Sequence, residues 1–340
     1  NYLDGGNILL SRIAENLYWT GRYIERAENT ARLLNVNYLA LIEAPLVPGA
    51  KGIVTEQWGP LLSFSENVEL FKEYFDKPDA QSVATWLALS YENPGSIRSS
   101  LALARENART LRDRISGEMW ESINSSYLQL CVEAPDHLDE DNLYDYCVGA
   151  KDFSHLFFGM AESTLTHDLG WYFIKAGRHL ERADNTLRAL RIRYKNYRGQ
   201  TQPVAEGLEA HRGMALLKSL SAYEAFRKYY HTALEPKYIA EFLLLHGQSP
   251  RSVRYNVRRL FEATNDLAKY NPDVDSEAKR LAGWLGSRLE YMPTVEQIID
   301  KEKPSIDDLI DALADISNAI SKTYFSYSDS PQQVQLQRQS

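Results

Sequence analysis

Apolar residues recur at three- and four-residue spacing along most of the chain, which is the pattern of amphipathic helices. The longest such run covers residues 9–44 and stops at Pro45, a residue that cannot continue a helix. Strand signals such as strict alternation and Asn-Gly turns are scarce. The sequence therefore predicts an all-α protein. The predicted helices cover residues 9–44, 55–76, 79–90, 94–114, 117–134, 140–161, 164–198, 208–232, 235–246, 250–270, 274–291 and 304–324.

One segment of the first predicted helix returns almost unchanged in the second half of the chain. Residues 21–34 read GRYIERAENTARLL and residues 177–190 read GRHLERADNTLRAL, so nine of the fourteen positions are identical. The same offset of 156 residues carries Asn-Pro-Gly-Ser-Ile-Arg at 93–98 onto Ser-Pro-Arg-Ser-Val-Arg at 249–254. Because one offset fits two separate motifs without a gap, the sequence predicts an internal duplication.

The duplication predicts about twelve helices in two pseudo-symmetric six-helix halves. The expected halves are residues 7–162 and 163–324, followed by a polar, glutamine-rich flexible tail over 325–340. The length of 340 residues fits two units of this size. The periodicity leaves open whether the halves are separate domains or one intertwined bundle.

The repeated segment has an apolar stripe and, on the opposite side of the helix, an arc of charged and amide side chains. The arc of the first copy consists of Arg22, Glu25, Arg26 and Asn29. The arc of the second copy consists of Arg178, Glu181, Arg182 and Asn185. Two arginines one helical turn apart can hold a carboxylate or a phosphate in bidentate fashion. If the two halves face each other, these arcs form a candidate anion-binding cleft.

Three interpretations of the two arcs stay open: a structural ion-pair network between the halves, a binding or catalytic cleft, and a solvated helix face. In the binding interpretation, the two glutamates orient the arginines. In the catalytic one, Glu25 or Glu181 acts as a general acid or base. The second repeated motif adds Arg98 and Arg254 near a helix start, where free N–H groups favour an anion. Helix capping explains the Ser and Pro residues of that motif equally well.

Composition and charge narrow the classes of function. The chain has 46 acidic and 38 basic residues, and its net charge of −8 is a poor footprint for binding nucleic acid or an anionic membrane surface. No apolar stretch reaches the roughly 18 residues of a membrane-spanning helix, and the first residues lack the pattern of a signal peptide. Two cysteines without a CxxC spacing fit a reducing compartment, so we expect a cytoplasmic protein.

The sequence has no recognisable motif for metal or cofactor chemistry. The Glu-Arg motif lacks the histidine at i+3 that di-iron bundles use, and His155, His167 and His179 have no recognisable carboxylate ligand set around them. Phosphate-binding loops of the Walker type, GxGxxG and GxSxG are missing. We therefore expect neither a metal nor a cofactor. Whether the chain is an enzyme stays open.

The segment LSRIAENLYWTGRYIERAENTAR at 10–32 resembles the bacterial Alpha-E family, an all-helical group named for its Glu-Arg motif. The sequence Ser-Pro-Arg-Ser-Val-Arg at 249–254 is similar to a later Pro-Arg-Ser-Val motif of that family. The likeness extends from about Leu9 to Tyr324. It implies an all-helical fold over nearly the whole chain.

In this resemblance, the motif of the family falls on Glu25-Arg26 and the duplication repeats it at Glu181-Arg182. Such proteins are encoded beside, or fused to, a circularly permuted ATP-grasp protein, and often a transglutaminase-like cysteine peptidase. ATP-grasp enzymes join a carboxylate to an amine through an acyl phosphate, so this neighbourhood implies peptide or amide-bond synthesis.

We therefore expect a helical partner or accessory subunit of a carboxylate–amine ligase system, with an anion-binding cleft lined by arginine and glutamate. One alternative is an enzyme in its own right that acts on a peptide or amino-acid substrate, with Glu25 or Glu181 as acid or base. Another is a structural scaffold that contains a buried Glu-Arg ion-pair network.

Overall fold

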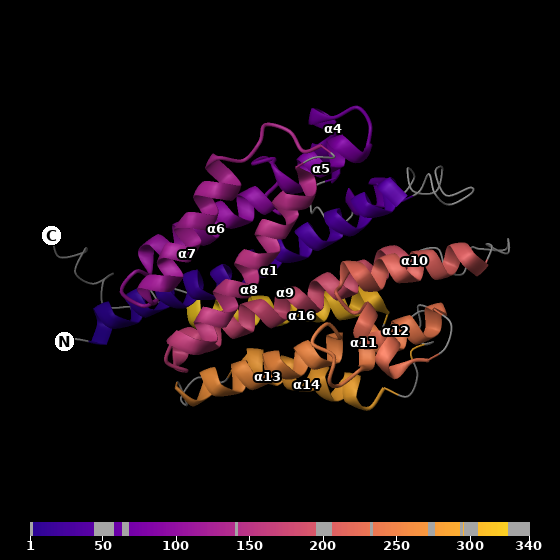
Figure 1. Cartoon of the computed structure of the whole chain (residues 1–340). Helices are drawn as coiled ribbons and strands as arrows, with labels where there is room; N and C mark the ends of the chain where they lie inside the picture. The colour runs from indigo at the N-terminus through magenta and orange to yellow at the C-terminus, as the bar shows by residue number, and fades with distance from the viewer. Residues whose placement is uncertain are drawn as a thin grey trace.

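Two long helices, α1 (Leu3–Glu43) and α9 (Leu169–Tyr194), pack against each other in the middle of the molecule (Figure 1). The chain is all-α throughout the part that the computed structural model describes, and no strand occurs there. The described residues are 3–43, 58–62, 68–139, 142–194, 206–231, 234–270, 276–292, 295 and 305–325.

The other helices form two groups around this central pair. The first group consists of α3 (Trp58–Leu61), α4 (Val68–Tyr74), α5 (Ala80–Ala88), α6 (Ile97–Thr110), α7 (Gly117–Tyr127) and α8 (Leu143–Thr164). The second group consists of α10 (Glu206–Ser219), α11 (Tyr223–Tyr229), α12 (Pro236–Leu245), α13 (Val253–Lys269), α14 (Glu277–Glu290) and α16 (Ile306–Ile320). Two π-helical turns, η3 (Leu128–Val132) and η5 (Ser321–Phe325), follow α7 and α16. Helices α6 and α8 pack on α1, whereas α13 and α16 pack on α9.

The apolar stripe predicted for the repeated segment is buried in both of its copies. Ile24, Ala27 and Ala31 of α1 are fully buried, and Leu180 and Ala183 occupy equivalent places on α9 with at most 2% exposure. These residues belong to one continuous hydrophobic core that includes both groups of helices. Because the stripe is at the centre of this core, the charged arc on the other side of α1 is brought close to α9.

Two glycines bring the backbones of α1 and α9 into direct contact. A Cβ atom on Gly21 would lie 2.5 Å from the carbonyl oxygen of Ile174, and one on Gly177 would collide with the carbonyl oxygen of Tyr18. Glycine costs a helix interior about 1 kcal/mol relative to alanine, but only glycine permits this approach. The contact therefore fixes how closely the two charged arcs can face each other.

The predicted fold class is confirmed, and the described residues contain fourteen α-helices rather than about twelve. The single helix predicted over 208–232 is wrong, because the chain breaks into α10 and α11 at Ser221, whose φ of 49° is left-handed. The described part of the helix predicted over 55–76 contains both α3 and α4.

Helices α6 and α13 start later than the predicted positions 94 and 250. They begin at Ile97 and Val253, because the N-cap hydroxyls belong to Ser96 and Ser252. The halves 7–162 and 163–324 stay predictions. Of the expected tail, residues 326–340 lie outside the described residues, while Phe325 is buried in η5.

Among the described helices, none combines the length and the apolar character needed to cross a membrane.

The close contact between α1 and α9 makes Gly177→Ala a strongly destabilising substitution. The added methyl meets a backbone carbonyl that cannot rotate away, so we expect a loss of about 1–3 kcal/mol in the free energy of unfolding. The matched control is Gly159→Ala on the exposed side of α8, where a Cβ meets nothing within 4 Å. That change should stabilise the protein by about 0.5–1 kcal/mol. Urea unfolding measures both, and equal effects would contradict the proposed contact.

Candidate functional site

The charged arcs of α1 and α9 face each other and form reciprocal ion pairs. Glu181 of α9 accepts hydrogen bonds from Nε of Arg22 at 2.7 Å and from Nε of Arg26 at 2.6 Å, both on α1. Glu25 of α1 accepts two hydrogen bonds from Arg182 of α9, through Nε and Nη2, each at 2.6 Å. Each glutamate of the repeated motif is thus neutralised by arginines of the opposite helix.

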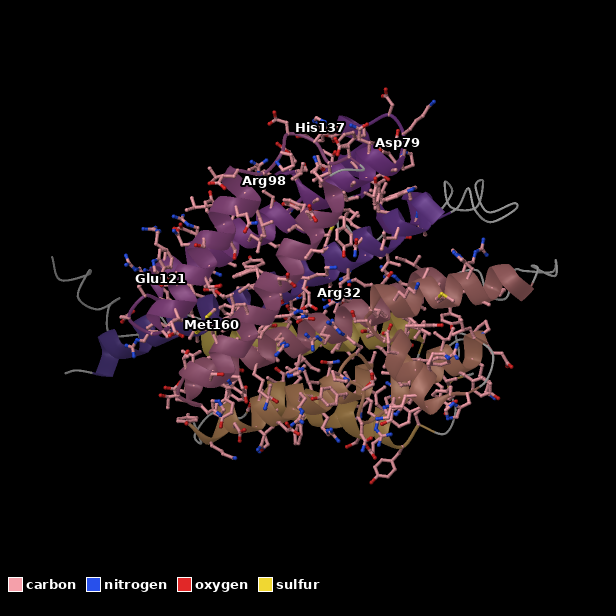
Figure 2. The ribbon with its side chains drawn as sticks, viewed as in Figure 1. Arg32, Asp79, Arg98, Glu121, His137 and Met160 are labelled. Atoms are coloured by element: carbon pink, nitrogen blue, oxygen red, sulfur yellow. The ribbon has the colours of Figure 1, made fainter. Side chains whose placement is uncertain are left out.

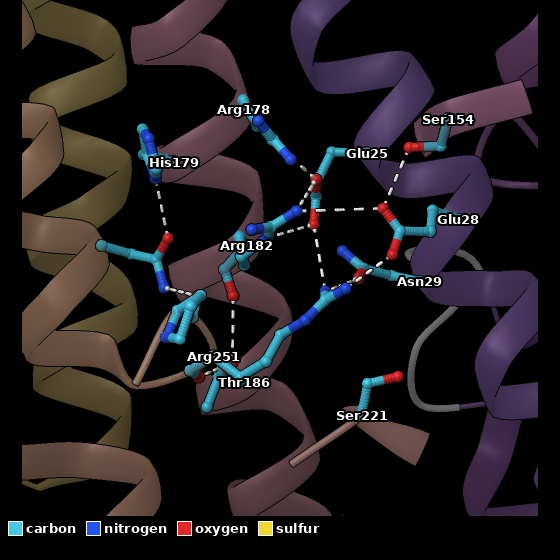
Figure 3. Close-up of polar contacts among 12 residues, drawn as sticks. Glu25, Glu28, Asn29, Ser154, Arg178, His179, Arg182, Thr186, Ser221 and Arg251 are labelled. Carbon is cyan, nitrogen blue, oxygen red and sulfur yellow. Dashed lines mark hydrogen bonds and ion pairs between the residues drawn. The ribbon is translucent and has the colours of Figure 1, made fainter. Parts of the chain in front are cut away.

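A third buried glutamate, Glu28, extends these pairs into a larger cluster (Figure 3). Arg251, in the turn before α13, donates to Glu28 Oε1 at 2.6 Å, and its Nη1 lies 3.3 Å from Glu25 Oε1. The same Nη1 donates to Asn29 Oδ1 at 3.2 Å. Ser154 of α8 donates to the other oxygen of Glu28 at 2.9 Å. The central ion-pair cluster is defined as Glu25, Glu28, Arg178, Arg182 and Arg251.

The arginines keep the buried carboxylates ionised. Burial pushes the pKa of Glu181 upward, but the charges of Arg26 and Arg22 outweigh it and lower the pKa to about 2. Burial likewise opposes ionisation of Glu28, and the charge of Arg251 is the largest of the influences that bring its pKa well below the usual value. Removing one member of such a buried pair usually costs about 3–5 kcal/mol, since it leaves an uncompensated charge.

A cavity of about 370 Å³, here called the Arg178 cavity, lies beside the cluster. Its walls include three aromatic side chains, Phe158, Trp171 and Tyr255. Its charged lining residues are Lys175, Arg178, Arg182, Arg259 and Glu162, which is four basic groups against one acidic group. Lys175 and Arg259 both form ion pairs with Glu262, and Arg182 forms one with Glu25.

Arg178 forms only a long ion pair at the wall of this cavity. Its Nε is buried without a hydrogen-bond partner, and the nearest carboxylate oxygen, Glu25 Oε2, is 3.6 Å away. Its guanidinium carbon lies 3.9 Å from the centre of the Phe158 ring. Burial, followed by the charge of Arg182, lowers the pKa of Arg178 to about 10. An additional anion in the cavity would relieve both influences.

His179 contributes a neutral imidazole to the same wall. Its Nδ1 lies 2.8 Å from Oδ1 of Asn256, and the amide nitrogen of Asn256 donates to the carbonyls of Pro250 and Ser252. The Asn256 oxygen must then accept, so Nδ1 of His179 carries the proton and Nε2 has a free lone pair. Burial moves the pKa of His179 well below its usual value, and the ring is uncharged at neutral pH.

A smaller cavity of about 40 Å³, here called the Asp184 cavity, lies next to the pairs made by Glu181. Asp184 and Arg188 of α9 form an ion pair there, with Nε and Oδ2 2.6 Å apart. The predicted site residues Asn29 and Asn185 both line this cavity, together with Arg26 and Gly95.

Two predicted anion-binding residues lie away from the arcs. Arg98 donates to the backbone carbonyl of Cys131, from Nε at 3.0 Å and Nη2 at 2.6 Å, and Figure 2 shows it near the outer edge of the molecule. Arg254 pairs with Glu290, with Nε and Oε2 2.9 Å apart. Both side chains therefore tie their own helix to a neighbouring element.

The helical-wheel argument did not single out Glu28 and Arg251, which complete the central cluster. Glu28 lies about one turn after Glu25, and that spacing could have drawn attention to it. Arg251 is part of the second repeated motif, but the equivalent position 95 is glycine, so a comparison of the two copies hides it. In the described ranges, no group of three His, Cys, Asp or Glu side chains could hold a metal ion.

The fold and the site define an all-helical domain whose centre consists of two facing Glu-Arg motifs. The chain belongs to the Alpha-E family, which it matches over residues 9–325. That family is described as "a predicted alpha-helical domain with a conserved ER motif". Glu25-Arg26 and Glu181-Arg182 are the two places where this sequence contains such a motif within the buried ion pairs.

The chain is also similar to longer mycobacterial proteins. It is 25% identical over 324 residues to the uncharacterized protein Mb2597 of Mycobacterium bovis and to the uncharacterized proteins MT2643 and Rv2567 of Mycobacterium tuberculosis. The alignments cover 90% of this chain and 34% of each relative, so the chain spans about a third of their length. No solved structure matches the chain significantly.

The lowered pKa of Glu181 predicts a specific loss of stability in acid. When folding lowers the pKa of a carboxyl group, its ionised form stabilises the folded state at any pH above the pKa of the unfolded state. This stabilisation is lost as the pH falls toward the pKa of the folded state. Between the ordinary value of 4.5 and about 2, the contribution is about 3 kcal/mol. Wild-type stability should therefore fall more steeply over this range than that of Glu181→Gln, as measured by urea unfolding at each pH.

The control for this comparison is Glu69→Gln, which alters an exposed pair with Lys72 and should keep the wild-type slope. If Glu181→Gln does not fold, the carboxyl carbon of Glu181 can be titrated by NMR in the wild type. A midpoint near 4.5 would contradict the assignment.

Proposed function

We propose that this Alpha-E domain is a non-catalytic, anion-binding partner of a carboxylate–amine ligase system of the ATP-grasp type. The observation that supports this most directly is the Nε of Arg178, which is buried without a hydrogen-bond partner, 3.6 Å from Glu25, beside a cavity lined by four basic side chains. An incoming carboxylate would accept charge-assisted hydrogen bonds from Arg178 and approach Lys175 and Arg259.

The walls of the Arg178 cavity suit a carboxylate attached to an apolar or peptide body. The volume of about 370 Å³ is in the range of small-ligand sites, roughly 300–1,000 Å³. Trp171 and Tyr255 offer ring surfaces for apolar groups, while Lys175 already lies 4.8 Å from the Trp171 ring centre. A peptide segment with a free carboxylate matches this combination of charge and aromatic surface.

The two motif glutamates have a supporting role in this proposal. Glu25 is fully buried and receives both hydrogen bonds of Arg182, so it offers no accessible oxygen to a substrate. Glu181 has a pKa of about 2, which makes it a weak base at neutral pH. Both carboxylates instead hold the arginines of the opposite helix in place, and the cavity beside them keeps a fixed shape.

The assignment of a ligase partner is supported by family resemblance and by the length of the relatives. The family resemblance implies a protein that is encoded beside, or fused to, a circularly permuted ATP-grasp protein. A transglutaminase-like peptidase often accompanies the two. In the mycobacterial relatives, the matching region is 34% of the chain, which leaves room for further domains. A domain that binds a carboxylate group would present a substrate or product to such an enzyme.

We also propose that the two groups of helices descend from one duplicated unit. Helices α5 and α12 begin 156 residues apart, and so do α6 and α13. The close contacts of Gly21 with Ile174 and of Gly177 with Tyr18 are related by the same offset. The reciprocal ion pairs of Glu25 with Arg182 and of Glu181 with Arg26 are a further consequence that such a duplication would have.

The anion-binding proposal predicts that a peptide with a free C-terminal carboxylate binds more tightly than the same peptide with a C-terminal amide. A hydrogen bond to a charged group contributes about 1.5–3 kcal/mol, so we expect at least a tenfold difference in Kd by calorimetry. Arg178→Gln should remove most of this difference. Arg109→Gln, which alters an exposed pair with Glu106, should leave it unchanged.

If Arg178→Gln perturbs folding, Arg259→Gln is a second test, because this partly exposed side chain lines the same cavity without joining the central cluster. Equal binding of the two peptides by the wild type would contradict the anion site.

The partner proposal predicts a stable complex with the circularly permuted ATP-grasp protein encoded by the same organism. Co-purification and light scattering at micromolar concentration should show a defined stoichiometry. Arg178→Gln should leave this complex intact, since the cavity binds ligand rather than the partner. The absence of a complex at these concentrations would contradict the partner role. It would not affect the conclusion from the peptide-binding experiment.

A further inference from the structure

The ion pair of Glu28 with Arg32 recurs 156 residues later between Asp184 and Arg188, whereas the ion pair of Glu28 with Arg251 does not. Glu28 receives a hydrogen bond from Arg32, four residues later on α1, at 2.7 Å, and another from Arg251 at 2.6 Å. Asp184, 156 residues after Glu28, receives the equivalent bond from Arg188 at 2.6 Å. The residue 156 positions before Arg251 is Gly95, which has no side chain to complete the set.

Gly95, which is 156 residues before Arg251, borders the Asp184 cavity. The cavity volume of about 40 Å³ is roughly three times the minimum of about 10–15 Å³ that one water needs. A guanidinium has only four heavy atoms and is planar, so its size is comparable with this space. The cavity can hold the head of such a group, while the rest of the ligand would extend outside.

The pKa values of the two carboxylates are shifted in opposite directions, downward for Glu28 and upward for Asp184. The pKa of Glu28 is well below its usual value, although burial opposes this, chiefly because of Arg251. Burial raises the pKa of Asp184 above its usual value, and Arg188 only partly offsets this. Asp184 is thus a partly buried carboxylate with fewer cationic contacts than the fully buried Glu28.

We infer that the Asp184 cavity binds a guanidinium group supplied by a ligand, which bridges Asp184 and Glu181 as Arg251 bridges Glu28 and Glu25. Arg251 places one nitrogen 2.6 Å from Glu28 and the other 3.3 Å from Glu25. A planar fork with several fixed donors spans two carboxylates in this way, whereas the compact ammonium of an amine does not.

The first cluster shows that this fold accommodates four guanidinium groups around two carboxylates. Around Glu25 and Glu28, four arginines (Arg32, Arg178, Arg182 and Arg251) contact two carboxylates. In the described part of the chain, Glu181 forms ion pairs with Arg22 and Arg26, and Asp184 forms one with Arg188. A bound guanidinium would give the group around Glu181 and Asp184 four guanidinium groups. The group around Glu25 and Glu28 already has that number.

The test uses agmatine, a small guanidine without a carboxylate, and putrescine, a diamine with the same chain and charge, as the ammonium control. NMR titration of the full chain should show saturable shifts at Asn185 and Gly95 with agmatine and much weaker ones with putrescine. A short arginine-containing peptide and its lysine counterpart form a second arm. Tighter binding of the arginine peptide than of agmatine would identify a protein side chain as the source of the guanidinium.

Three variants make the test specific. Gly95→Arg should fill the cavity from within, abolish agmatine binding and raise the thermal midpoint, because Gly95 has no left-handed φ that would strain a side chain. Gly95→Ala adds the Cβ alone, which would lie 3.3 Å from Asn93 Oδ1, and brings no charge into the cavity. This variant should still bind agmatine. Asp184→Asn should weaken agmatine binding at least tenfold and serves as the test if Gly95→Arg does not fold.

Two outcomes would overturn the proposal. If the cavity holds water only, agmatine produces no saturable shifts and Gly95→Arg leaves the thermal midpoint unchanged or lower. If agmatine binds equally well to the wild type and to Asp184→Asn, the guanidinium lies elsewhere. Carboxylate binding in the Arg178 cavity should be unaffected by all three variants, so the two sites can fail independently.

Discussion

The close contact of α1 with α9 is the constraint on which the rest of the structure depends. Gly21 and Gly177 allow the two backbones to touch, and the charged arcs beside them can no longer face water. A buried charge is tolerated only when it is paired with good geometry. The reciprocal hydrogen bonds of Glu25 with Arg182 and of Glu181 with Arg26 meet this requirement. The ER motif therefore serves first to make a close helix contact possible.

The same constraint explains why Arg178 forms only a long ion pair, the feature on which the proposed anion site rests. Glu25 and Glu28 have already received strong hydrogen bonds from Arg182 and Arg251, so Arg178 finds only a distant oxygen at 3.6 Å. Arg178 loses most of its hydration when the chain folds, so ligand binding does not have to remove that water again. An anion that enters the Arg178 cavity meets donors that are already held in position, which lowers the ordering cost of association.

The sequence allowed the helical class, the buried stripe and the charged arcs to be predicted, because all three depend on the 3.6-residue period. It could not decide among the interpretations of the arcs, since a helical wheel shows which residues share a face but not what lies opposite. Arg251 was outside its reach for another reason: the residue comes from a turn, where periodicity carries no information, and its counterpart is Gly95. The break at Ser221 likewise depends on a single left-handed φ.

Both proposed sites lie where residues 156 positions apart in the sequence differ in identity or in ion pairing. Where Arg251 is present, its guanidinium joins Glu28 to Glu25, and the cluster is complete within the chain. Where Gly95 replaces it, an incompletely compensated Asp184 borders a small cavity. On the other side of the cluster, Arg178 has a cationic surplus. Under the proposals above, one helix pair thus offers a site for an anion and another for a cation. Because each arises where the ion pairing of the two copies is unequal, a change at position 95 or 178 should alter one site without dismantling the contact that holds both helices together.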